Sequence, residues 1–252
     1  KREQLNLNDA LKISGLAIIF HIAKSVKHYL FTGKVQEESE VDIYSYMETY
    51  TYNAIKILHG IDDKNLLRIE NQLKYTFQQV CRNSIWAVAE KNPKIKRFFE
   101  SCLNSKDYLL YSLLPSQRDC ILDILTTKKS IVLNMPTSSG KSLLAELYIL
   151  FTMHNYSTGN ESPTICYIVP TNALINQVCR NLKDDFVEFG FNIETVLPFY
   201  DIDQIEEEIL TSKKIDILVS TPEKLDFLIR KDHPSLKNLR LVILDEAHNI
   251  AD

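Results

Sequence analysis

The sequence predicts an α/β protein in two parts: an all-helical domain over residues 1–112 and a parallel-sheet domain over residues 113–252. Three observations support this. The first hundred residues carry apolar side chains three and four positions apart, as amphipathic helices do. From about residue 115, apolar runs of strand length alternate with helical segments, which is typical of parallel sheets covered by helices. A Gly-Lys-Ser sequence follows the first of these runs, where such sheets bind their ligands.

The N-terminal part should contain four helices joined by short breaks. Periodic apolar spacing predicts helices over residues 5–31, 41–59, 66–90 and 95–103. Asn8 or Asp9 can cap the first helix, and Asn92 followed by Pro93 separates the last two. Because every segment has one apolar face, we expect these helices to pack on one another.

The C-terminal part should contain five parallel strands with helices between them. The apolar runs predict strands over residues 130–134, 164–169, 191–197, 216–220 and 240–244. Helical segments are expected at 116–127, 141–155, 171–189, 202–212 and 222–231. The runs at 130–134 and 240–244 lack polar alternation, so we expect both to be buried strands.

Composition limits the possible classes of protein. Apolar residues make up 45% of the 252 residues, enough for a sizeable core, and the net charge is −4. Residues 1–114 carry 16 Lys+Arg against 13 Asp+Glu, whereas 115–252 carry 13 against 20. The chain therefore has no dominant basic field, and only local patches could hold nucleic acid. No segment of 18 apolar residues free of charge is present, so no membrane partner is expected.

The cysteines and the chain ends predict a cytoplasmic piece of a longer protein. The cysteines are odd in number and have no metal-type spacing, which indicates reduced thiols in the cytoplasm, or in the nucleus of a eukaryote. They are Cys81, Cys102, Cys120, Cys166 and Cys179. The sequence begins without Met and stops just after a strand-ending Asp-Glu-Ala-His, so we expect further chain beyond it.

A phosphate-binding loop is predicted between the first strand and its helix. The loop residues expected to hold the phosphates are Pro136, Thr137, Ser138, Ser139, Gly140, Lys141 and Ser142. Backbone N–H groups at the start of a helix can receive a polyphosphate. Lys141 would reach the β- and γ-phosphates of ATP, and the Ser142 hydroxyl would bind Mg²⁺. The alternative is an ordinary Gly-Lys-Ser turn without a ligand.

An acidic pair after the last strand is the predicted partner of this loop. Asp245 and Glu246 follow the run at 240–244, which should place them at the same sheet edge as Lys141. Asp245 can then bind Mg²⁺, and Glu246 can take a proton from the attacking water. The three catalytic candidates are therefore Lys141, Asp245 and Glu246, unless the pair is only a solvated strand end.

These motifs resemble motifs I and II of superfamily 2 helicases, and the resemblance extends to three more stretches over residues 113–248. Leu113-Leu-Pro-Ser-Gln117 is similar to the Q motif, which implies that Gln117 reads the adenine edge, with Tyr108 or Tyr111 able to stack on the base. The resemblance further implies that His248 couples the ATP state to a second domain.

Two more stretches resemble the motifs that hold one strand of nucleic acid in this family. Val169-Pro170-Thr171 resembles motif Ia, and Thr221-Pro222-Glu-Lys resembles motif Ib. The implied contacts run from Pro170, Thr171, Thr221 and Pro222 to the sugar-phosphate backbone, so they carry no sequence information. Thr221 can also cap the following helix, with Pro222 at its first position.

The family resemblance implies a RecA-like fold for residues 113–252, truncated before motif III, with ATP and Mg²⁺ as cofactors. The loop has Met135 where the family usually has Ala or Gly, and Ser138 where it often has Gly. The sequence of the loop and the helix after it resembles the Ski-like DExH branch most, and bacterial antiphage helicases of the Hachiman type belong near this branch.

The implied function is an ATP-dependent helicase or translocase acting on single-stranded or partly duplex DNA or RNA. A second RecA-like domain of the same longer chain would supply an arginine, so the fragment alone should hydrolyse ATP poorly. The helical domain could dock a partner protein. Two alternatives remain: a nucleotide-switched subunit of a defence or restriction complex without unwinding, and a non-catalytic nucleic-acid-binding scaffold.

Overall fold

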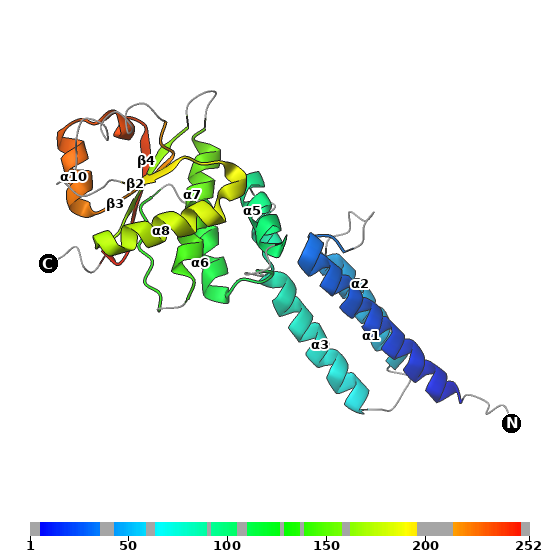
Figure 1. The fold of residues 1–252 in the computed structure, drawn as a ribbon. Helices are drawn as coiled ribbons and strands as arrows, with labels where there is room; N and C mark the ends of the chain where they lie inside the picture. The colour runs from blue at the N-terminus through cyan, green and yellow to red at the C-terminus, as the bar shows by residue number, and fades with distance from the viewer. Residues whose placement is uncertain are drawn as a thin grey trace. The chain divides into compact units, whose positions relative to one another are not determined.

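The computed structural model describes most of the chain. The described residues are 6–35, 43–58, 64–89, 92–104, 110–126, 129–136, 139–157, 162–195 and 214–247. The chain divides into two units, Lys1–Asp119 and Cys120–Asp252 (Figure 1). This division falls inside the helix that begins at Pro115, and the predicted domain boundary after residue 112 stays a prediction. The predicted helix at 202–212 lies outside the described residues.

The first unit is helical, as its apolar spacing predicts. Its helices are α1 (Leu7–Thr32), α2 (Ile43–Leu58), α3 (Lys64–Arg82), α4 (Trp86–Ala89) and α5 (Pro93–Asn104), followed by the start of α6 (Pro115–Thr126). The first three helices contact one another and lie side by side in Figure 1. A buried hydrogen bond of 2.8 Å between the hydroxyls of Ser25 and Tyr46 joins α1 to α2. None of the described helices is long and apolar enough to cross a membrane.

The single helix predicted over residues 66–90 is wrong, because the structure breaks it at residues 83–85. α3 ends at Arg82, and Ser84 forms an isolated antiparallel bridge with Ser112. The Ser84 hydroxyl accepts a hydrogen bond from the Trp86 backbone N–H at 3.2 Å. Serine competes in this way with helical backbone hydrogen bonds. The apolar spacing continues across the break because Cys81 before it and Trp86 after it are both buried.

Gly33 ends α1 against the ring of Trp86. Gly33 has φ +74°, and a Cβ added to it would lie 2.9 Å from Trp86 Cδ2. The ring cannot move away easily because its Nε1–H donates to the Leu30 carbonyl at 2.9 Å. Glycine is therefore required at this position both by the left-handed backbone and by the close approach of the indole.

We expect Gly33→Ala to lower the free energy of unfolding of the helical unit by about 2–5 kcal/mol, from left-handed strain and overpacking together. Gly190→Ala is the matched control, since Gly190 has φ +62° but no atom within 4 Å of an added Cβ. That change should cost about 1–2 kcal/mol. Urea unfolding followed by circular dichroism compares the two, and fluorescence of Trp86, the single tryptophan, reports the first unit. Equal losses would contradict the role of the ring.

The second unit contains a sheet of four parallel strands in the order β2-β3-β1-β4. The strands are β1 (Thr164–Ile168), β2 (Ile193–Thr195), β3 (Ile217–Ser220) and β4 (Leu239–Leu244). The helices are α7 (Lys141–Asn155), α8 (Asn172–Asp185) and α10 (Pro222–Arg230), with short 3₁₀ turns at Val187–Phe189 and Pro234–Leu236. The α/β fold class and four of the five predicted strands are thereby confirmed.

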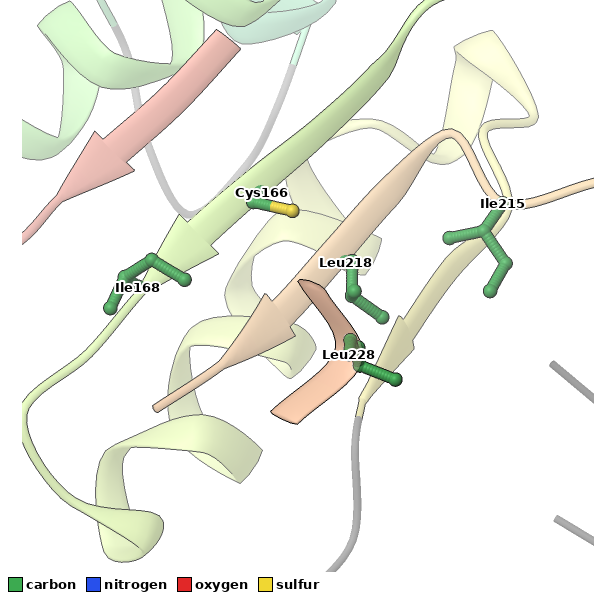
Figure 2. Close-up of a cluster of buried hydrophobic side chains, with 5 residues drawn as sticks. All are labelled: Cys166, Ile168, Ile215, Leu218 and Leu228. Carbon is green, nitrogen blue, oxygen red and sulfur yellow. The ribbon is translucent and has the colours of Figure 1, made fainter. Parts of the chain in front are cut away.

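The core of this unit lies between the central strands and the helices. β1 and β3 are buried along their whole length. Cys166 and Leu218, from these two strands, belong to one buried apolar cluster with Leu228 of α10 (Figure 2). α8 contacts β2 and β3, and α7 contacts β4. The sheet is thus held by helices along its central strands, which keeps their carboxyl ends in fixed positions.

The predicted buried strand at 130–134 is wrong. Residues 130–136 have no regular secondary structure, and the Val132 side chain is 93% exposed. The run at 240–244, which was also expected to be buried, forms β4 but is only partly buried. Among the described strands it pairs only with β1, and its residues alternate between half-buried and exposed. Val242 and Leu244 lie on its exposed side. β-branched residues favour a strand, but only pairing with a neighbour makes one, and pairing is a long-range contact.

Candidate functional site

The candidate site lies at the carboxyl edge of the sheet. The Val169 N–H donates to the Ser220 carbonyl and the Asp245 N–H donates to the Ile168 carbonyl, each at 2.9 Å. The ends of β3, β1 and β4 are therefore held side by side. Because these strands are parallel and adjacent, the residues that follow them share one edge, where α/β sheets bind ligands.

The phosphate-binding candidates lie at the start of α7. Gly140 is the N-cap with φ 77° and ψ 36°, and Lys141 and Ser142 form the first helical positions. Before it, the Pro136 carbonyl accepts from the Ser139 backbone N–H at 3.4 Å and from its hydroxyl at 2.6 Å. Gly140 has no side chain with which to cap the helix, so the helix start presents its N–H groups and positive dipole end. Thr137 and Ser138 lie outside the described residues.

Lys141 and Glu246 come together across the sheet edge, as the sequence predicts. Lys141 Nζ lies 3.8 Å from Glu246 Oε1, with side chains 34% and 39% exposed. An ion pair this exposed contributes little to stability and is easily exchanged for another partner. A phosphate group arriving at α7 can therefore replace Glu246 as the partner of Lys141.

The backbone at Glu246 is unusual. Glu246 has φ +48°, and its N–H donates to the Asp245 carboxylate Oδ1 at 3.0 Å. A non-glycine residue in this region stores about 1–3 kcal/mol of strain, and such residues cluster at functional sites. The turn separates the two carboxylates: one is held by the neighbouring N–H, and the other points to Lys141. Distinct roles for Asp245 and Glu246 are consistent with this geometry.

Sequence analysis did not single out Tyr167, a buried residue of β1. Burial raises the pKa of the Tyr167 phenol, and the charges of Asp245 and Glu146 and a hydrogen-bonding interaction with Asp245 raise it further. The phenol therefore stays protonated and can donate toward the Asp245 carboxylate. In the sequence, Tyr167 is one aromatic residue in an apolar strand, so no local signal marks it.

Glu146 of α7 and Asp185 of α8 form a carboxyl pair. Burial raises the pKa of Glu146 well above its ordinary value, and the charge of Asp185 and a hydrogen bond with it add to the rise. Burial also raises the pKa of Asp185, followed by the charge of Asp184. Two interacting carboxyl groups favour sharing one proton, which the larger pKa rise assigns to Glu146.

This pair makes the stability of the second unit depend on pH. The folded pKa of Glu146 lies above its ordinary 4.5, so the folded state binds the proton more tightly and stability falls as pH rises from 4.5 through the raised pKa. Glu146→Gln mimics the protonated form and should flatten this fall. Near pH 7 the variant should therefore be more stable than the unchanged protein. Urea unfolding at pH 4.5 to 8 measures both slopes, and identical slopes would contradict the shared proton.

Gln117, the predicted adenine contact, lies in the first unit. Its side chain is buried, and its Oε1 accepts from the Leu114 backbone N–H at 2.8 Å. An amide at the third helical position commonly binds the N-cap N–H in this way. Tyr111 is exposed, whereas Tyr108 lies outside the described residues. The contact between Gln117 and adenine stays a prediction.

The two threonines predicted to meet nucleic acid differ in exposure. Thr171 is the exposed N-cap of α8, whereas Thr221, the N-cap of α10, is only 4% exposed. Thr221 occupies the predicted N-cap position, although neither threonine makes a side-chain capping hydrogen bond. Instead, the pKa of Glu223 is lowered by its own backbone N–H and then by the Thr221 hydroxyl. The hydroxyl is used within α10, which local sequence cannot reveal.

Of the other predicted site residues, the two prolines lie within the described residues and His248 does not. Pro170 and Pro222 precede or open α8 and α10 and are partly exposed. Pro222 occupies the first turn of its helix, as predicted. His248, the predicted coupling residue, lies outside the described residues.

A parallel sheet with Gly-Lys-Ser opening one helix and an Asp-Glu pair after β4 is typical of nucleotide-binding proteins of the P-loop class. Residues 114–252 match the family model described as DEAD/DEAH box helicase. The chain belongs to the DEAD/DEAH box helicase family.

Individual relatives agree with the branch predicted from the motifs. The chain is 30% identical to Hachiman protein HamB of Bacillus cereus over 179 residues, 70% of this chain and 15% of HamB. It is 30% identical to the ATP-dependent DNA helicase Hel308 of Methanocaldococcus jannaschii over 151 residues, 58% of this chain and 12% of Hel308. It is 32% identical to the ATP-dependent DNA helicase MER3 of Saccharomyces cerevisiae over 139 residues, 54% of this chain and 11% of MER3. Resemblance to superfamily 2 helicases of the Ski-like branch is thereby confirmed.

A solved structure shows the same fold. The RNA helicase Prp28 of Chaetomium thermophilum, crystallised with ADP, aligns with a TM-score of 0.50 and 22% identity over 62% of this chain and 37% of Prp28. The chain spans 11–15% of the length of the three relatives described above. It therefore corresponds to a small part of these proteins.

Proposed function

We propose that this chain is the ATP-binding part of an ATP-dependent nucleic-acid helicase or translocase. The observation that carries the proposal is the 3.8 Å approach of Lys141 to Glu246, which joins the start of α7 to the turn after β4. A phosphate-binding cation and a carboxylate able to act as base thus face each other across one site. Family membership supplies the class of reaction.

Each residue of the edge has a role in ATP hydrolysis. The loop from Pro136 to Ser142 receives the phosphates, and Lys141 balances the charge of the β- and γ-phosphates. Ser142 and Asp245 would hold Mg²⁺, because the Ser142 hydroxyl is exposed at the helix start and Asp245 follows a neighbouring strand. Bound Mg²⁺ supplies charge neutralisation at the terminal phosphates. Glu246, once released by Lys141, takes the proton of the attacking water.

The other motif residues connect this chemistry to its partners. Gln117 contacts adenine, and Pro170, Thr171, Thr221 and Pro222 line the path of one nucleic-acid strand. The exposed N-cap of α8 supports the Thr171 contact, since N–H groups at a helix start bind phosphate without reading sequence. His248 relays the nucleotide state to a second RecA-like domain of the longer chain.

The decisive experiment uses the full-length protein that contains this chain. ATP hydrolysis is measured without polymer, with single-stranded DNA and with single-stranded RNA. Stimulation by one polymer supports the proposal and identifies the nucleic acid along which the protein moves. A strand-displacement assay on a duplex then distinguishes a helicase from a translocase without unwinding activity. Hydrolysis that no polymer stimulates favours a nucleotide-switched subunit of a defence or restriction complex. No hydrolysis under any condition favours a non-catalytic scaffold and overturns the proposal.

A further inference from the structure

The segment that leads into Gln117 is paired with the turn between α3 and α4. The Asn83 carbonyl accepts from the Leu113 N–H at 2.7 Å, and the Ile85 N–H donates to the Tyr111 carbonyl at 3.5 Å. Between them, Ser84 and Ser112 form an antiparallel bridge. This pairing breaks the long helix predicted over residues 66–90. The break therefore has a partner, which is the lead-in to the predicted adenine contact.

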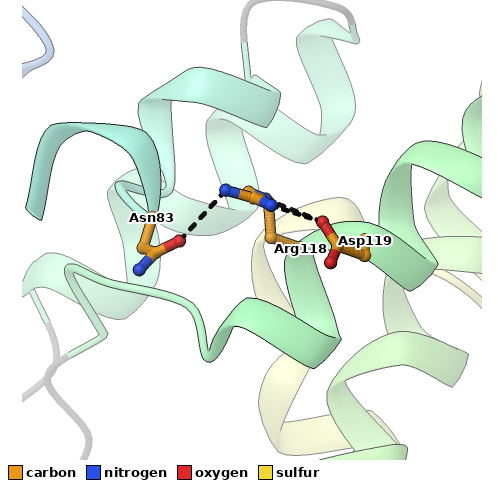
Figure 3. A network of polar contacts seen from close by, with 3 residues as sticks. All are labelled: Asn83, Arg118 and Asp119. Atoms are coloured by element: carbon orange, nitrogen blue, oxygen red, sulfur yellow. Dashed lines mark hydrogen bonds and ion pairs between the residues drawn. The ribbon is translucent and has the colours of Figure 1, made fainter. Parts of the chain in front are cut away.

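A side-chain network holds the other flank of Gln117 to the same turn. Arg118 Nη1 donates to Asn83 Oδ1 at 3.4 Å, and Arg118 Nε and Nη2 donate to Asp119 Oδ1 at 3.0 and 2.5 Å (Figure 3). The Arg118 side chain is only 12% exposed. Asn83 thus binds residues before and after Gln117 in the sequence: its backbone carbonyl accepts from Leu113, and its side-chain oxygen accepts from Arg118.

The Gln117 amide depends on these contacts for its orientation. Its Oε1 is anchored on the N–H of Leu114, the residue next to Leu113. Ser84, Ile85 and Leu113 are buried, so water does not compete with the pairing that places Leu114. A displacement of Leu113 would move the anchor of the amide. An amide can tell the edge of adenine from that of guanine only while its donor and acceptor ends stay in place.

We propose that Asn83 is a positioning residue for adenine recognition, which holds the Gln117 amide in place through Leu113 and Arg118 and so favours ATP over GTP. The inference rests on the proposed role of Gln117 at adenine. Asn83 lies outside residues 114–252, the part that matches the helicase family model. Asn83 would thereby contribute to nucleotide selectivity without touching the nucleotide itself.

The test compares ATP with GTP in the full-length protein. Asn83→Ala removes the side-chain contact with Arg118 and keeps the backbone contact with Leu113. It should lower the ATP-to-GTP ratio of kcat/KM by roughly two- to tenfold, the range for one hydrogen bond. The loss should appear in the KM for ATP, with kcat and the constants for GTP unchanged. Asn83→Asp keeps an oxygen acceptor opposite Arg118 and should restore the ratio. A merely structural role would weaken both nucleotides equally, and that outcome would overturn the inference.

Asn104→Ala is the matched control within the same unit. The Asn104 side chain donates to the Glu100 carbonyl of its own helix at 2.9 Å, so its removal should leave the ratio unchanged. Fluorescence of buried Trp86 shows whether each variant is folded at the assay temperature. If Asn83→Ala does not fold, Arg118→Lys carries the test, because lysine keeps the charge but lacks the planar fork that reaches Asn83 and Asp119.

Gln117→Ala separates this inference from the proposed function. If it leaves the ATP-to-GTP ratio unchanged, Gln117 does not read adenine, and the role of Asn83 fails with it. If Gln117→Ala lowers the ratio while Asn83→Ala does not, the positioning role alone is overturned. A lower ATP-to-GTP ratio in both Gln117→Ala and Asn83→Ala, with the ratio restored by Asn83→Asp, supports the inference.

Discussion

Replacing Glu246 with glutamine should slow ATP hydrolysis by about 10²–10⁴-fold, the usual contribution of a general base. Glutamine has nearly the shape of glutamate but cannot accept the proton of the attacking water. ATP binding should persist, because Lys141 and the start of α7 are unchanged and Lys141 no longer has Glu246 as a competing partner. Single-turnover hydrolysis and equilibrium binding of a fluorescent ATP analogue, both on the full-length protein, measure the two effects separately.

Glu188→Gln is the matched control for this change. Glu188 is an exposed carboxylate on the 3₁₀ turn Val187–Phe189 in the same unit. Its replacement should leave both hydrolysis and binding at the level of the unchanged protein. Normal hydrolysis by the Glu246 variant would exclude this residue as the base and require another group to activate water.

Replacing Lys141 with alanine should produce a different defect, in which nucleotide binding itself is lost. A hydrogen bond to a charged partner contributes about 1.5–3 kcal/mol, which corresponds to roughly 10–150-fold in affinity for ATP. Hydrolysis should fall as well, because Lys141 also balances charge that develops on the phosphates. Stability should change little, since the Lys141–Glu246 pair is exposed in the absence of nucleotide.

Lys183→Ala supplies the comparison for the lysine. Lys183 is an exposed residue in the last turn of α8, away from the carboxyl edge of the sheet. Equilibrium binding of ATP to the two full-length variants, with urea unfolding as a check of stability, distinguishes a local effect from a general one. ATP affinity that survives in the Lys141 variant would show that the loop does not hold the phosphates through this side chain.

The elements with strong local signals were predicted well. α7 matches its predicted range of 141–155, and the strands at 164–169, 216–220 and 240–244 appear within one or two residues of their predicted positions. These segments combine an apolar run with a clear boundary, so propensity and periodicity agree. The wrong strand at 130–134 has the same kind of run but no pairing partner among the described strands. Local propensity is similar for residues 130–134 and for the observed strands, so the presence of a neighbouring strand decides whether a run becomes a strand.

The candidate site likewise contains features that local sequence predicted and features that depend on tertiary contacts. The rule that parallel strands share a carboxyl edge predicted that Asp245 lies at the same edge as Lys141. The structure brings the next residue, Glu246, to 3.8 Å from Lys141, and the chemical roles of these residues stay predictions. Tyr167 and Glu146 were missed because an aromatic residue in a strand and an acid in a helix look ordinary in sequence. Their unusual character comes from burial and from charges on other elements.

Residues close in sequence were sufficient to define the family, the phosphate-binding loop and the acidic pair after β4, because each is a short motif with a fixed order along the chain. Folding was needed to reveal the contact between Asn83 and Arg118, 35 positions apart, and the break in the helix that makes it possible. A hydrogen bond across that separation has no counterpart in local periodicity, since its energy depends on where distant backbone groups come to lie.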